Sequence, residues 1–365
     1  MRIVIDAREY STSTGRYISR LIQNLEEVDE ANDYTVLLRQ ADYEIYQPKN
    51  PRFSKVATKY KEFSFGEQLG LARQLRRLKA DLVHFGMTQQ PVRYKRPKVT
   101  TVHDLTTARF KNPAKNSLVF AFKQRVYRRV IKKVARQSAA LITPSEFVKN
   151  DLAAYAKIDP GKITVTPEAA DPITATPEPL TGLIGKQFLL YVGRPTPHKN
   201  LERLLEAFHR LRADHPELIL VLGGKKDANY QRIETMARHS ASKGLLFTNY
   251  LQEGQLRWLY ENCSAYVFPS LSEGFGLPGL EAMAHGAPVV SSNATSLPEV
   301  YGQAAHYFDP EDTTTIAAAI NDVLTDQKLR QDLINRGHEQ VKKYSWRRMA
   351  EQTLAVYRQI LDQKG

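Results

Sequence analysis

Short apolar runs alternate with amphipathic helical patterns along the chain. In the first half, the runs predict buried strands at 3–5, 34–38, 81–85, 99–102 and 139–142. Between them, apolar residues at helical spacing predict helices over 15–27, 66–79 and 116–137. Strands that alternate with helices in this way indicate a parallel sheet covered on both faces.

The alternation restarts after a proline-rich stretch that begins at Asp171 and predicts a linker. Further strands are predicted at 188–192, 217–222, 245–247, 265–268 and 288–291, and helices near 200–213, 229–243, 253–262, 278–285, 312–324 and 345–361. We therefore predict an α/β protein with two doubly wound, Rossmann-like domains that face each other across a cleft. The expected division is an N-terminal domain over 1–170, a linker over 171–185, a C-terminal domain over 186–344, and a last segment, 345–365, that packs back on the N-terminal domain.

The stretch 269–290 follows a predicted strand and opens a helix. Gly274 and Gly276 lie in the loop before this helix, and glycines let backbone amides approach a ligand closely. The helix N-terminus behind them favours an anion such as a phosphate. Glu273 in the loop and Glu281 on the helix can both face one cleft. The stretch therefore predicts a binding site for a phosphorylated ligand.

Gly274, Gly276 and Gly279 also match G-x-G-x-x-G, the pattern of dinucleotide-binding folds. Against that interpretation, the motif lies late in the chain rather than after the first strand of its domain, and Pro278 interrupts it. Glu299 follows about 20 residues later, where such folds place an acidic residue, but within a Ser-Leu-Pro-Glu sequence that predicts a turn. An NAD-dependent oxidoreductase stays open as an alternative.

Composition excludes several other classes. The chain has 365 residues, of which 42% are hydrophobic and 25% charged, so it is neither disordered nor fibrous. With a mean hydropathy of −0.44 and no apolar run of about 18 residues, no membrane-spanning helix is predicted. The single cysteine, Cys263, excludes a disulfide framework and a multi-cysteine zinc site. The first residues predict a strand rather than a signal peptide, so we expect a cytoplasmic protein.

Positive charge is concentrated in the first half of the chain. The net charge is +13, and residues 91–136 contain 14 basic residues and one acid, Asp104. The helix over 116–137 combines an apolar stripe with basic residues, which suits either an anionic membrane surface or a core-packed helix with a solvated basic face. A nucleic-acid-binding protein is a further alternative, but no stacking-aromatic motif or basic recognition helix of known type is present, so no nucleic acid is expected as a partner.

Several motifs together resemble the retaining glycosyltransferases of family 4, which have the GT-B fold. The motifs, in chain order, are Ile5-Asp-Ala-Arg followed by Gly15-Arg-Tyr, Thr101-Val-His-Asp-Leu, Thr143-Pro-Ser-Glu-Phe, Tyr191-Val-Gly-Arg with Lys199-Asn, Glu273-Gly-Phe-Gly-Leu-Pro with Glu281, and Tyr344-Ser-Trp. The resemblance covers almost the whole chain. It implies that the N-terminal domain faces the acceptor and that the C-terminal domain binds a nucleotide-sugar donor.

The resemblance also implies roles for cationic residues. Arg194 and Lys199, at the carboxyl end of the first strand of the second domain, would stabilise the charge that grows on the diphosphate leaving group. His103 would line the cleft near the donor sugar. The neighbouring Asp104 either orients the imidazole or caps the following turn, and both interpretations stay open.

The remaining donor contacts are implied for carboxylates and backbone amides. Glu273 would contact the donor sugar, and Glu281 would accept hydrogen bonds from the ribose hydroxyls. Amides that hold the sugar hydroxyls or the phosphate are expected from Phe275, Gly276 and Leu277. From the first domain, Gly15 and Arg16 would place an amide against the diphosphate, although this chain has less glycine before that point than the family usually shows.

The chain contains no Asp-x-Asp, and Asp309-Pro-Glu-Asp312 predicts a turn and a helix cap instead. We therefore expect neither a metal nor another cofactor, and the family implies retention of configuration by front-face attack. The preferred donor is GDP-mannose, with UDP-glucose or a UDP-N-acetylhexosamine as the alternative. The expected acceptor is a glycan or a lipid-linked acceptor, with peripheral association on the inner face of the cell membrane.

Overall fold

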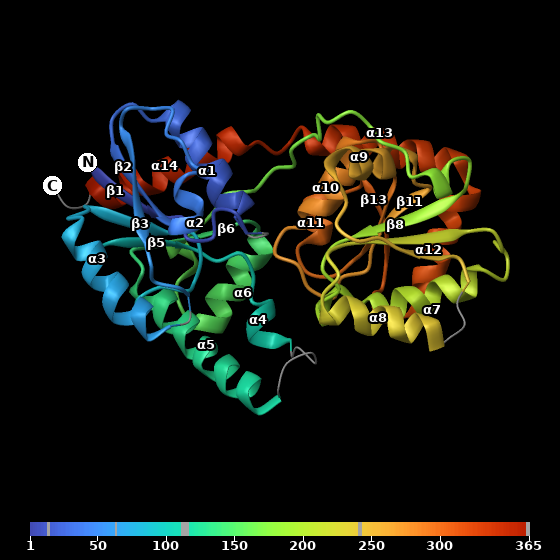
Figure 1. Cartoon of the computed structure of the whole chain (residues 1–365), viewed down its shortest axis with the longest axis horizontal. Coiled ribbons are helices and arrows are strands. Elements are labelled where there is room, and N and C mark those ends of the chain that lie inside the picture. Colours follow the sequence, from blue (N-terminus) through green and yellow to red (C-terminus); the bar gives the residue numbers. More distant parts are fainter. Residues whose placement is uncertain (13–14, 63, 111–116, 240–242, 363–365) are drawn as a thin grey trace. The chain divides into compact units, whose positions relative to one another are not determined.

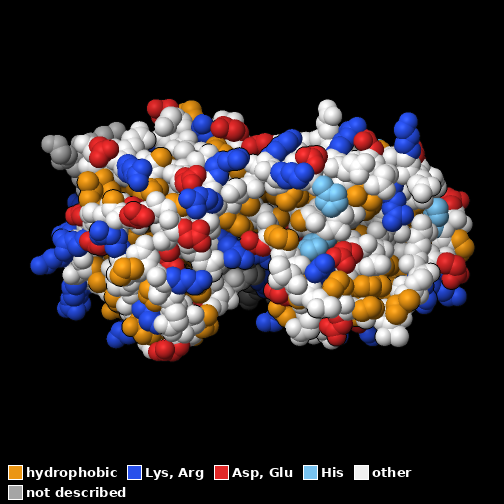
Figure 2. All heavy atoms as spheres, turned by 90° about the horizontal axis from the view of Figure 1, so that it is seen from above, with side chains coloured by type: hydrophobic (Ala, Val, Ile, Leu, Met, Phe, Trp, Pro, Cys, Tyr) orange, Lys and Arg blue, Asp and Glu red, His pale blue; other side chains and the backbone are white. Residues whose placement is uncertain are grey.

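A computed structural model describes residues 1–12, 15–62, 64–110, 117–239 and 243–362. Contacts divide the chain into two compact units. Unit 1 comprises Met1–Ala108, Phe122–Glu168 and Ser345–Gly365, and unit 2 comprises Arg109–Ala121 and Ala169–Tyr344. Figure 2 shows one face of the molecule, on which acidic and basic side chains are interspersed.

Among the described residues, seven parallel strands form the sheet of unit 1, in the order β3-β2-β1-β4-β5-β6-β7 (Figure 1). Their bounds are β1 Arg2–Asp6, β2 Asp33–Arg39, β3 Phe53–Thr58, β4 Leu82–Phe85, β5 Lys98–Thr101, β6 Ala140–Thr143 and β7 Ile163–Val165. The strand order changes direction between β1 and β4, where Ile3 pairs with both Tyr34 of β2 and Leu82 of β4. In sheets of this topology the carboxyl ends at that switch point form the usual ligand site.

Helices connect these strands. They are α1 Arg16–Val28, α2 Gln40–Tyr43, a π-helical turn at Glu67–Leu71, α3 Ala72–Arg77, α4 Thr106–Arg109, α5 Ser117–Gln137, α6 Glu146–Ala156 and a 3-10 turn at Pro160–Lys162. The last helix of the chain, α14 Trp346–Asp362, also lies in unit 1, beside α1 (Figure 1). Its apolar side buries Met349, Leu354 and Tyr357, so the end of the chain completes the core of unit 1.

Unit 2 contains a second parallel sheet, with six strands in its described part, in the order β10-β9-β8-β11-β12-β13. The bounds are β8 Phe188–Val192, β9 Ile219–Gly223, β10 Leu245–Phe247, β11 Ala265–Phe268, β12 Val289–Ser292 and β13 Ala305–Phe308. This order repeats the one in unit 1, and its switch point lies between β8 and β11.

The helices of unit 2 cover both faces of this sheet. They are α7 Leu201–Leu211, α8 Ala228–His239, α9 Glu253–Asn262, α10 Leu277–Ala284, α11 Leu297–Tyr301, α12 Thr313–Thr325 and α13 Gln327–Val341, with 3-10 turns at Thr181–Leu183 and Pro197–Lys199. Buried apolar residues of the strands and helices form a continuous core. The predicted fold class of two Rossmann-like parallel sheets is therefore confirmed.

Some local predictions were wrong. The Ser-Leu-Pro-Glu sequence, predicted as a turn, opens helix α11, because Pro298 occupies the first helical turn, where a missing N–H costs nothing. In the division by contacts, Arg109 and Phe110 group with unit 2, and the Phe110 ring lies 5.7 Å from the ring of His198. The cap predicted at Asp312 is present, because its carboxylate accepts the N–H of Thr314 at 2.8 Å.

Candidate functional site

In unit 2, the loops that follow β8 and β11 are tied together at the switch point of the sheet. The N–H of Leu271 donates to the carbonyl of His198 at 2.7 Å. The buried side chain of Asn200 donates to two carbonyls, Pro269 O at 3.1 Å and Pro310 O at 2.7 Å. Asn200 has φ +59°, a left-handed conformation that asparagine tolerates better than most residues. It therefore ends the 3-10 turn and clamps the two loops at once.

This clamp brings Lys199 and Glu273 into direct contact. Lys199 Nζ lies 2.5 Å from Glu273 Oε1, and their side chains are 16% and 12% exposed. The same ammonium lies 5.2 Å from the centre of the Phe268 ring. A poorly solvated charged group is costly to bury without a partner, and here each of the two side chains is the partner of the other.

Hydrogen bonds also fix the backbone of the loop that carries Glu273. Its N–H donates to Thr295 Oγ1 at 3.0 Å, and its carbonyl accepts the hydroxyl of Ser296 at 3.0 Å. Gly276, at the start of α10, has φ +97°, and a Cβ there would lie 2.5 Å from the hydroxyl of Tyr301. That hydroxyl donates to Gly276 O at 2.6 Å. The helix mouth therefore requires a glycine at this position.

Other residues predicted for the donor site have separate surroundings. Arg194 is 63% exposed, and its Nε lies 3.0 Å from Oδ2 of Asp227. The two cations predicted to act together therefore contact different carboxylates, Asp227 for Arg194 and Glu273 for Lys199. Hydrogen bonds from the amides of α8 and from Arg194 hold the pKa of Asp227 below its ordinary value, although burial acts in the opposite direction. Phe275 buries its ring against Tyr344, with centroids 5.3 Å apart, so only its backbone is available to a ligand.

The last two predicted donor residues lie on α10. Leu277 is its first residue, as a helix-mouth amide requires. Glu281 is almost completely buried, and its Oε2 accepts the hydroxyl of Tyr260 at 3.5 Å. The structure therefore joins Lys199 to Glu273 directly and places Glu281 on the helix that follows the same loop.

In unit 1, His103 follows β5 at the carboxyl edge of the sheet. Its Nδ1 lies 3.0 Å from Glu168 Oε1, and its Nε2 lies 3.1 Å from the carbonyl oxygen of Gly86. The ring of Tyr17 packs against it edge-on, with centroids 4.8 Å apart. Burial acts to lower the pKa of His103, but the hydrogen bond to Glu168 and the charge of that carboxylate raise it above the ordinary value.

Of the two interpretations of Asp104, the structure supports the cap. Its carboxylate accepts the N–H of Thr106 at 2.7 Å and also the Thr106 hydroxyl. The carboxylate that contacts the imidazole is Glu168, which the sequence analysis missed. Glu168 follows β7, so the signal available in the sequence was an acidic residue just after a strand.

In the loop after β1, Gly15 lies in a tight turn. The N–H of Gly15 donates to Thr12 O at 2.9 Å, and a Cβ on Gly15 would lie 2.0 Å from the carbonyl oxygen of Glu9. Glycine is therefore required for packing of this turn. Arg16 is the exposed first residue of α1, and Ser13 and Thr14, part of the same predicted loop, lie outside the described residues.

A hollow of about 220 Å³ lies at this edge of unit 1. Its lining combines carboxylates with other polar side chains, and these residues include Asp6, Glu9, Glu62, Thr88, Gln89, His103 and Asp104. Two of the carboxylates are paired with one cation, because the guanidinium of Arg39 contacts Glu9 at 2.7 Å and Glu62 at 2.5 Å. The hollow therefore offers acceptors for hydroxyl groups.

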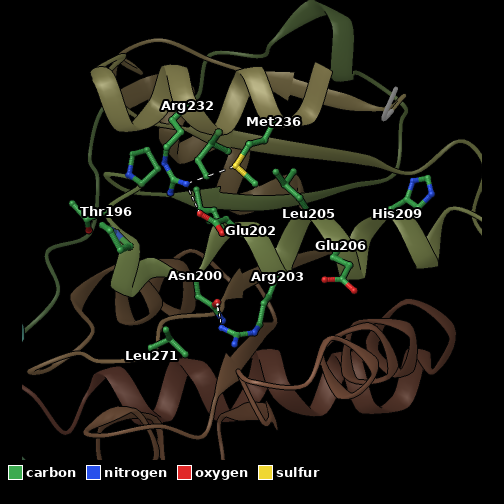
Figure 3. Close-up of a pocket in the computed structure, with 14 residues that line it drawn as sticks. Thr196, Asn200, Glu202, Arg203, Leu205, Glu206, His209, Arg232, Met236 and Leu271 are labelled. Atoms are coloured by element: carbon green, nitrogen blue, oxygen red, sulfur yellow. Dashed lines mark hydrogen bonds and ion pairs between the residues drawn. The ribbon is translucent and has the colours of Figure 1, made fainter. Parts of the chain in front are cut away.

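Unit 2 has a further hollow of about 640 Å³ between α7 and α8, next to the loop that carries Lys199 (Figure 3). In this hollow Arg232 points toward Glu202, with Nη1 and Oε1 2.6 Å apart, and Arg203 donates to the Asn200 side chain at 3.0 Å. Neither Lys199 nor Glu273 lines it. Its size therefore does not mark it as the site of the chemistry.

Comparison with protein families defines the class of this protein. Residues 14–173 match the model of Glycosyltransferase Family 4, and residues 182–340 match that of Glycosyl transferases group 1. The chain therefore belongs to these glycosyltransferase families, which confirms the resemblance seen in its motifs.

Among individual relatives, O-antigen chain mannosyltransferase B of Escherichia coli is 33% identical over 234 residues, which make up 60% of this chain and 60% of that protein. The serotype-specific mannosyltransferase WbdA of Escherichia coli is 36% identical over 181 residues, or 48% of this chain and 22% of that protein. The chain thus spans less than two thirds of the length of either relative.

Solved structures share the fold at low sequence identity. Sucrose-phosphate synthase from Thermosynechococcus elongatus superposes with a TM-score of 0.79 at 18% identity and covers 99% of both chains. HepE from Anabaena, in complex with UDP and glucose, gives a TM-score of 0.75 at 16% identity, with 98% of this chain and 99% of that chain covered. These likenesses support the GT-B fold. In the part of this chain that the structure describes, no helix is long and apolar enough to span a bilayer.

Proposed function

We propose that this protein transfers a hexose from a nucleotide diphosphate sugar to a glycan acceptor. The observation that carries the proposal is the contact between Lys199 and Glu273, 2.5 Å apart, with Glu273 in the loop before α10, whose N-cap is Gly276. The chain in which it occurs matches both glycosyltransferase family models. An ammonium has three N–H donors, so Lys199 can hold Glu273 and a diphosphate oxygen at once. Glu273 then has acceptor capacity left for a hydroxyl of the donor sugar.

In the other proposed donor contacts, cations and amides again face the phosphates, and carboxylates face hydroxyl groups. Arg194 is exposed beside the same switch-point loop, where it can exchange Asp227 for a phosphate. Glu281 supplies acceptors for the ribose hydroxyls, and the first amides of α10, with the helix dipole behind them, face the leaving group. These fixed dipoles and cations would stabilise the charge that develops as the sugar–phosphate bond breaks.

For the donor, we propose GDP-mannose. The support comes from the relatives, which include O-antigen chain mannosyltransferase B and WbdA. A UDP-sugar is the alternative, because a protein of the same fold, HepE, is known in complex with UDP and glucose. We further propose that transfer needs no metal ion, since Lys199 and Arg194 supply the positive charge that a metal would give, and that it retains configuration, as the family resemblance implies.

For the acceptor, we propose a neutral sugar bound in the carboxylate-lined hollow of unit 1. Carboxylate oxygens of Glu9, Glu62 and Asp104 are suited to accept hydroxyl donors, whereas Asp6 is fully buried and held by Arg8. A lipid-linked glycan fits this chemistry if its sugar end enters the hollow.

We also propose that α5 carries unit 1 to an anionic membrane surface. Phe122 and Val126, one turn apart on α5, are 70% and 41% exposed, and Lys123, Arg125 and Arg129 beside them are exposed as well. Ile131 and Val134, farther along the same helix, are buried. The helix is therefore core-packed at one end and presents apolar and basic groups together at the other, as interfacial helices do. Leu118, also predicted for the apolar stripe, lies outside the residues whose side chains are described.

Nucleotide release from a panel of nucleotide sugars tests the proposed transfer. We expect release of GDP from GDP-mannose, equal with and without EDTA, and at least 100-fold less in Lys199→Ala, since removal of one preorganised charge contact costs about 10²–10³ in rate. Lys226→Ala, which removes another lysine of unit 2 that pairs with a glutamate, is the matched control and should retain the wild-type rate. Wild-type release by Lys199→Ala, or release from none of the donors, would overturn the proposal.

A further inference from the structure

His103 has an acceptor at each ring nitrogen. Nδ1 faces Oε1 of Glu168 at 3.0 Å, and Nε2 faces the carbonyl of Gly86 at 3.1 Å. The Glu168 side chain is 8% exposed, so water can do little to replace this contact. A backbone carbonyl and a carboxylate offer lone pairs and no hydrogen.

A neutral imidazole carries one N–H and cannot satisfy both contacts. If His103 were neutral with its hydrogen on Nε2, the lone pair of Nδ1 would face the carboxylate of Glu168. The geometry is satisfied by an imidazolium, which donates from one nitrogen to the Glu168 carboxylate and from the other to the Gly86 carbonyl. Because the carboxylate stabilises this form, the pKa of His103 is raised, even though burial opposes the charge.

The groups around His103 set its charge balance. Those that interact with it or line the same hollow are Glu168, Asp104, His84, Tyr17, Asp6, Glu9, Glu62 and Tyr127. Asp104 adds a smaller favourable charge. His84, on the neighbouring strand β4, does not oppose the charge of His103, because burial lowers the pKa of His84 to about 3 and keeps that ring neutral. Two guanidinium groups lie among these carboxylates, because Arg8 contacts Asp6 at 2.8 Å and Arg39 contacts both Glu9 and Glu62. The five carboxylates named here outnumber these two cations.

We propose that Glu168 and the Gly86 carbonyl hold His103 as a doubly protonated cation, so that His103 serves glycosyl transfer as a fixed positive charge and not as the base that takes the acceptor's proton. Glu168 is then a positioning residue, which acts through His103 without touching substrate. The part of this inference that concerns catalysis rests on the proposed function, whereas the protonation of His103 does not.

The two roles of His103 give opposite pH dependences. A base works when it is deprotonated, so the rate would rise as the pH rises through the pKa of His103. A fixed cation works when it is protonated, so the rate falls over the same interval. We expect kcat/KM for the proposed transfer to fall on the alkaline side. In Glu168→Gln, this fall moves to lower pH, and each unit of displacement gives about a tenfold loss at pH values above both midpoints.

Nitrogen-15 NMR of the full-length protein, labelled at histidine, gives a readout that is independent of activity. The signals of His103 are assigned by their loss in His103→Gln. We expect both ring nitrogens to show imidazolium shifts at pH 7 in the wild type, and the titration midpoint to fall in Glu168→Gln. Glu146→Gln, which removes a carboxylate from α6 in the same unit, is the matched control and should leave the midpoint unchanged.

The outcomes separate this inference from the proposed function. A single N–H on His103 at pH 7, or an unchanged midpoint in a folded Glu168→Gln, would overturn the inference whatever the enzyme does. If circular dichroism shows that Glu168→Gln is unfolded, the nitrogen-15 NMR spectrum of the wild type at pH 7 alone decides the protonation state of His103. A wild-type rate that rises with pH through the His103 midpoint would refute the cationic role. Failure to turn over any nucleotide sugar would refute the proposed function and leave the protonation measurement standing.

Discussion

The burial of His84 leads us to predict a defined decrease in the free energy of unfolding at acidic pH. Its Nδ1 lies 2.5 Å from the hydroxyl of Tyr357 and its Nε2 lies 2.8 Å from Thr101 Oγ1, and the side chain is fully buried. Burial, with a smaller contribution from the charge of His103, lowers the pKa of His84 from 6.5 to about 3. In the unfolded chain the same histidine titrates near pH 6.5, so below that pH the unfolded state binds a proton that the folded state does not.

The size of the effect follows from the two pKa values. For a group that is neutral at pH 7 in both states, lowering the pH through 6.5 favours unfolding until the folded pKa is reached. Between pH 7 and pH 5, the linkage relation gives a loss of about 2 kcal/mol in the free energy of unfolding. The raised pKa of His103 offsets part of this loss, because it adds stability as the pH falls toward 6.5. The 2 kcal/mol is therefore the contribution of His84 alone, which a comparison of a His84 variant with its parent isolates.

The perturbation is His84→Gln, which removes the titration and retains hydrogen-bonding capacity toward Thr101 and Tyr357. Unit 1 can be followed separately, because the chain has two tryptophans and Trp346 lies in α14 of that unit. Urea unfolding, measured by Trp346 fluorescence in a Trp258→Phe background, should show about 2 kcal/mol less loss from pH 7 to pH 5 in the variant than in its parent. His209→Gln, which replaces an exposed histidine of unit 2, should behave like the parent. An equal loss in His84→Gln and its parent would refute the reasoning.

Two further predictions concern the loop clamp and the exposed helix. Asn200→Gly preserves the left-handed backbone but deletes the side-chain hydrogen bonds to Pro269 O and Pro310 O. Nucleotide release should therefore fall at least tenfold, while the circular dichroism spectrum is retained. An unchanged rate would show that the contacts of Asn200 do not position Lys199. The double variant Phe122→Ser, Val126→Ser should lose most of its low-salt co-sedimentation with anionic vesicles, whereas Ile184→Ser, at an exposed apolar residue of unit 2, should not. Equal sedimentation of the wild type with anionic and neutral vesicles would count against a membrane role for α5.

The central strands could be predicted from sequence because burial on both faces makes them continuous apolar runs. Among the described residues, the sequence analysis missed three strands, and each is an edge strand: β3 and β7 are the two edges of the sheet of unit 1, and β13 is an edge of the sheet of unit 2. Their residues are only partly buried, so polar side chains interrupt the apolar pattern, as Ser54 and Lys55 do in β3. Helix α6 was also missed, although Ser145 caps it by accepting the N–H of Val148 at 3.2 Å.

The candidate site was predictable where its motifs are local and unpredictable where its contacts are distant in sequence. The loop, the glycine mouth and the helix form one continuous stretch, so their arrangement could be inferred from residue types. The Lys199–Glu273 contact joins residues 74 positions apart, and only the strand order makes β8 and β11 neighbours. Likewise, nothing in the sequence around Asp227 indicates that it contacts Arg194, 33 positions away.

His84 and His103 show why the residue type alone could not assign a role to a histidine. His84 lies on β4 and His103 follows the neighbouring strand β5, and each ring has two hydrogen-bond partners. The partners of His84 are hydroxyls, each of which can donate or accept, so a neutral ring is satisfied and burial keeps it neutral. Those of His103 are a carboxylate and a carbonyl, which can only accept, so a neutral ring is not satisfied. It follows that Glu168→Gln should make His103 resemble His84, because an amide can supply the hydrogen that a carboxylate cannot.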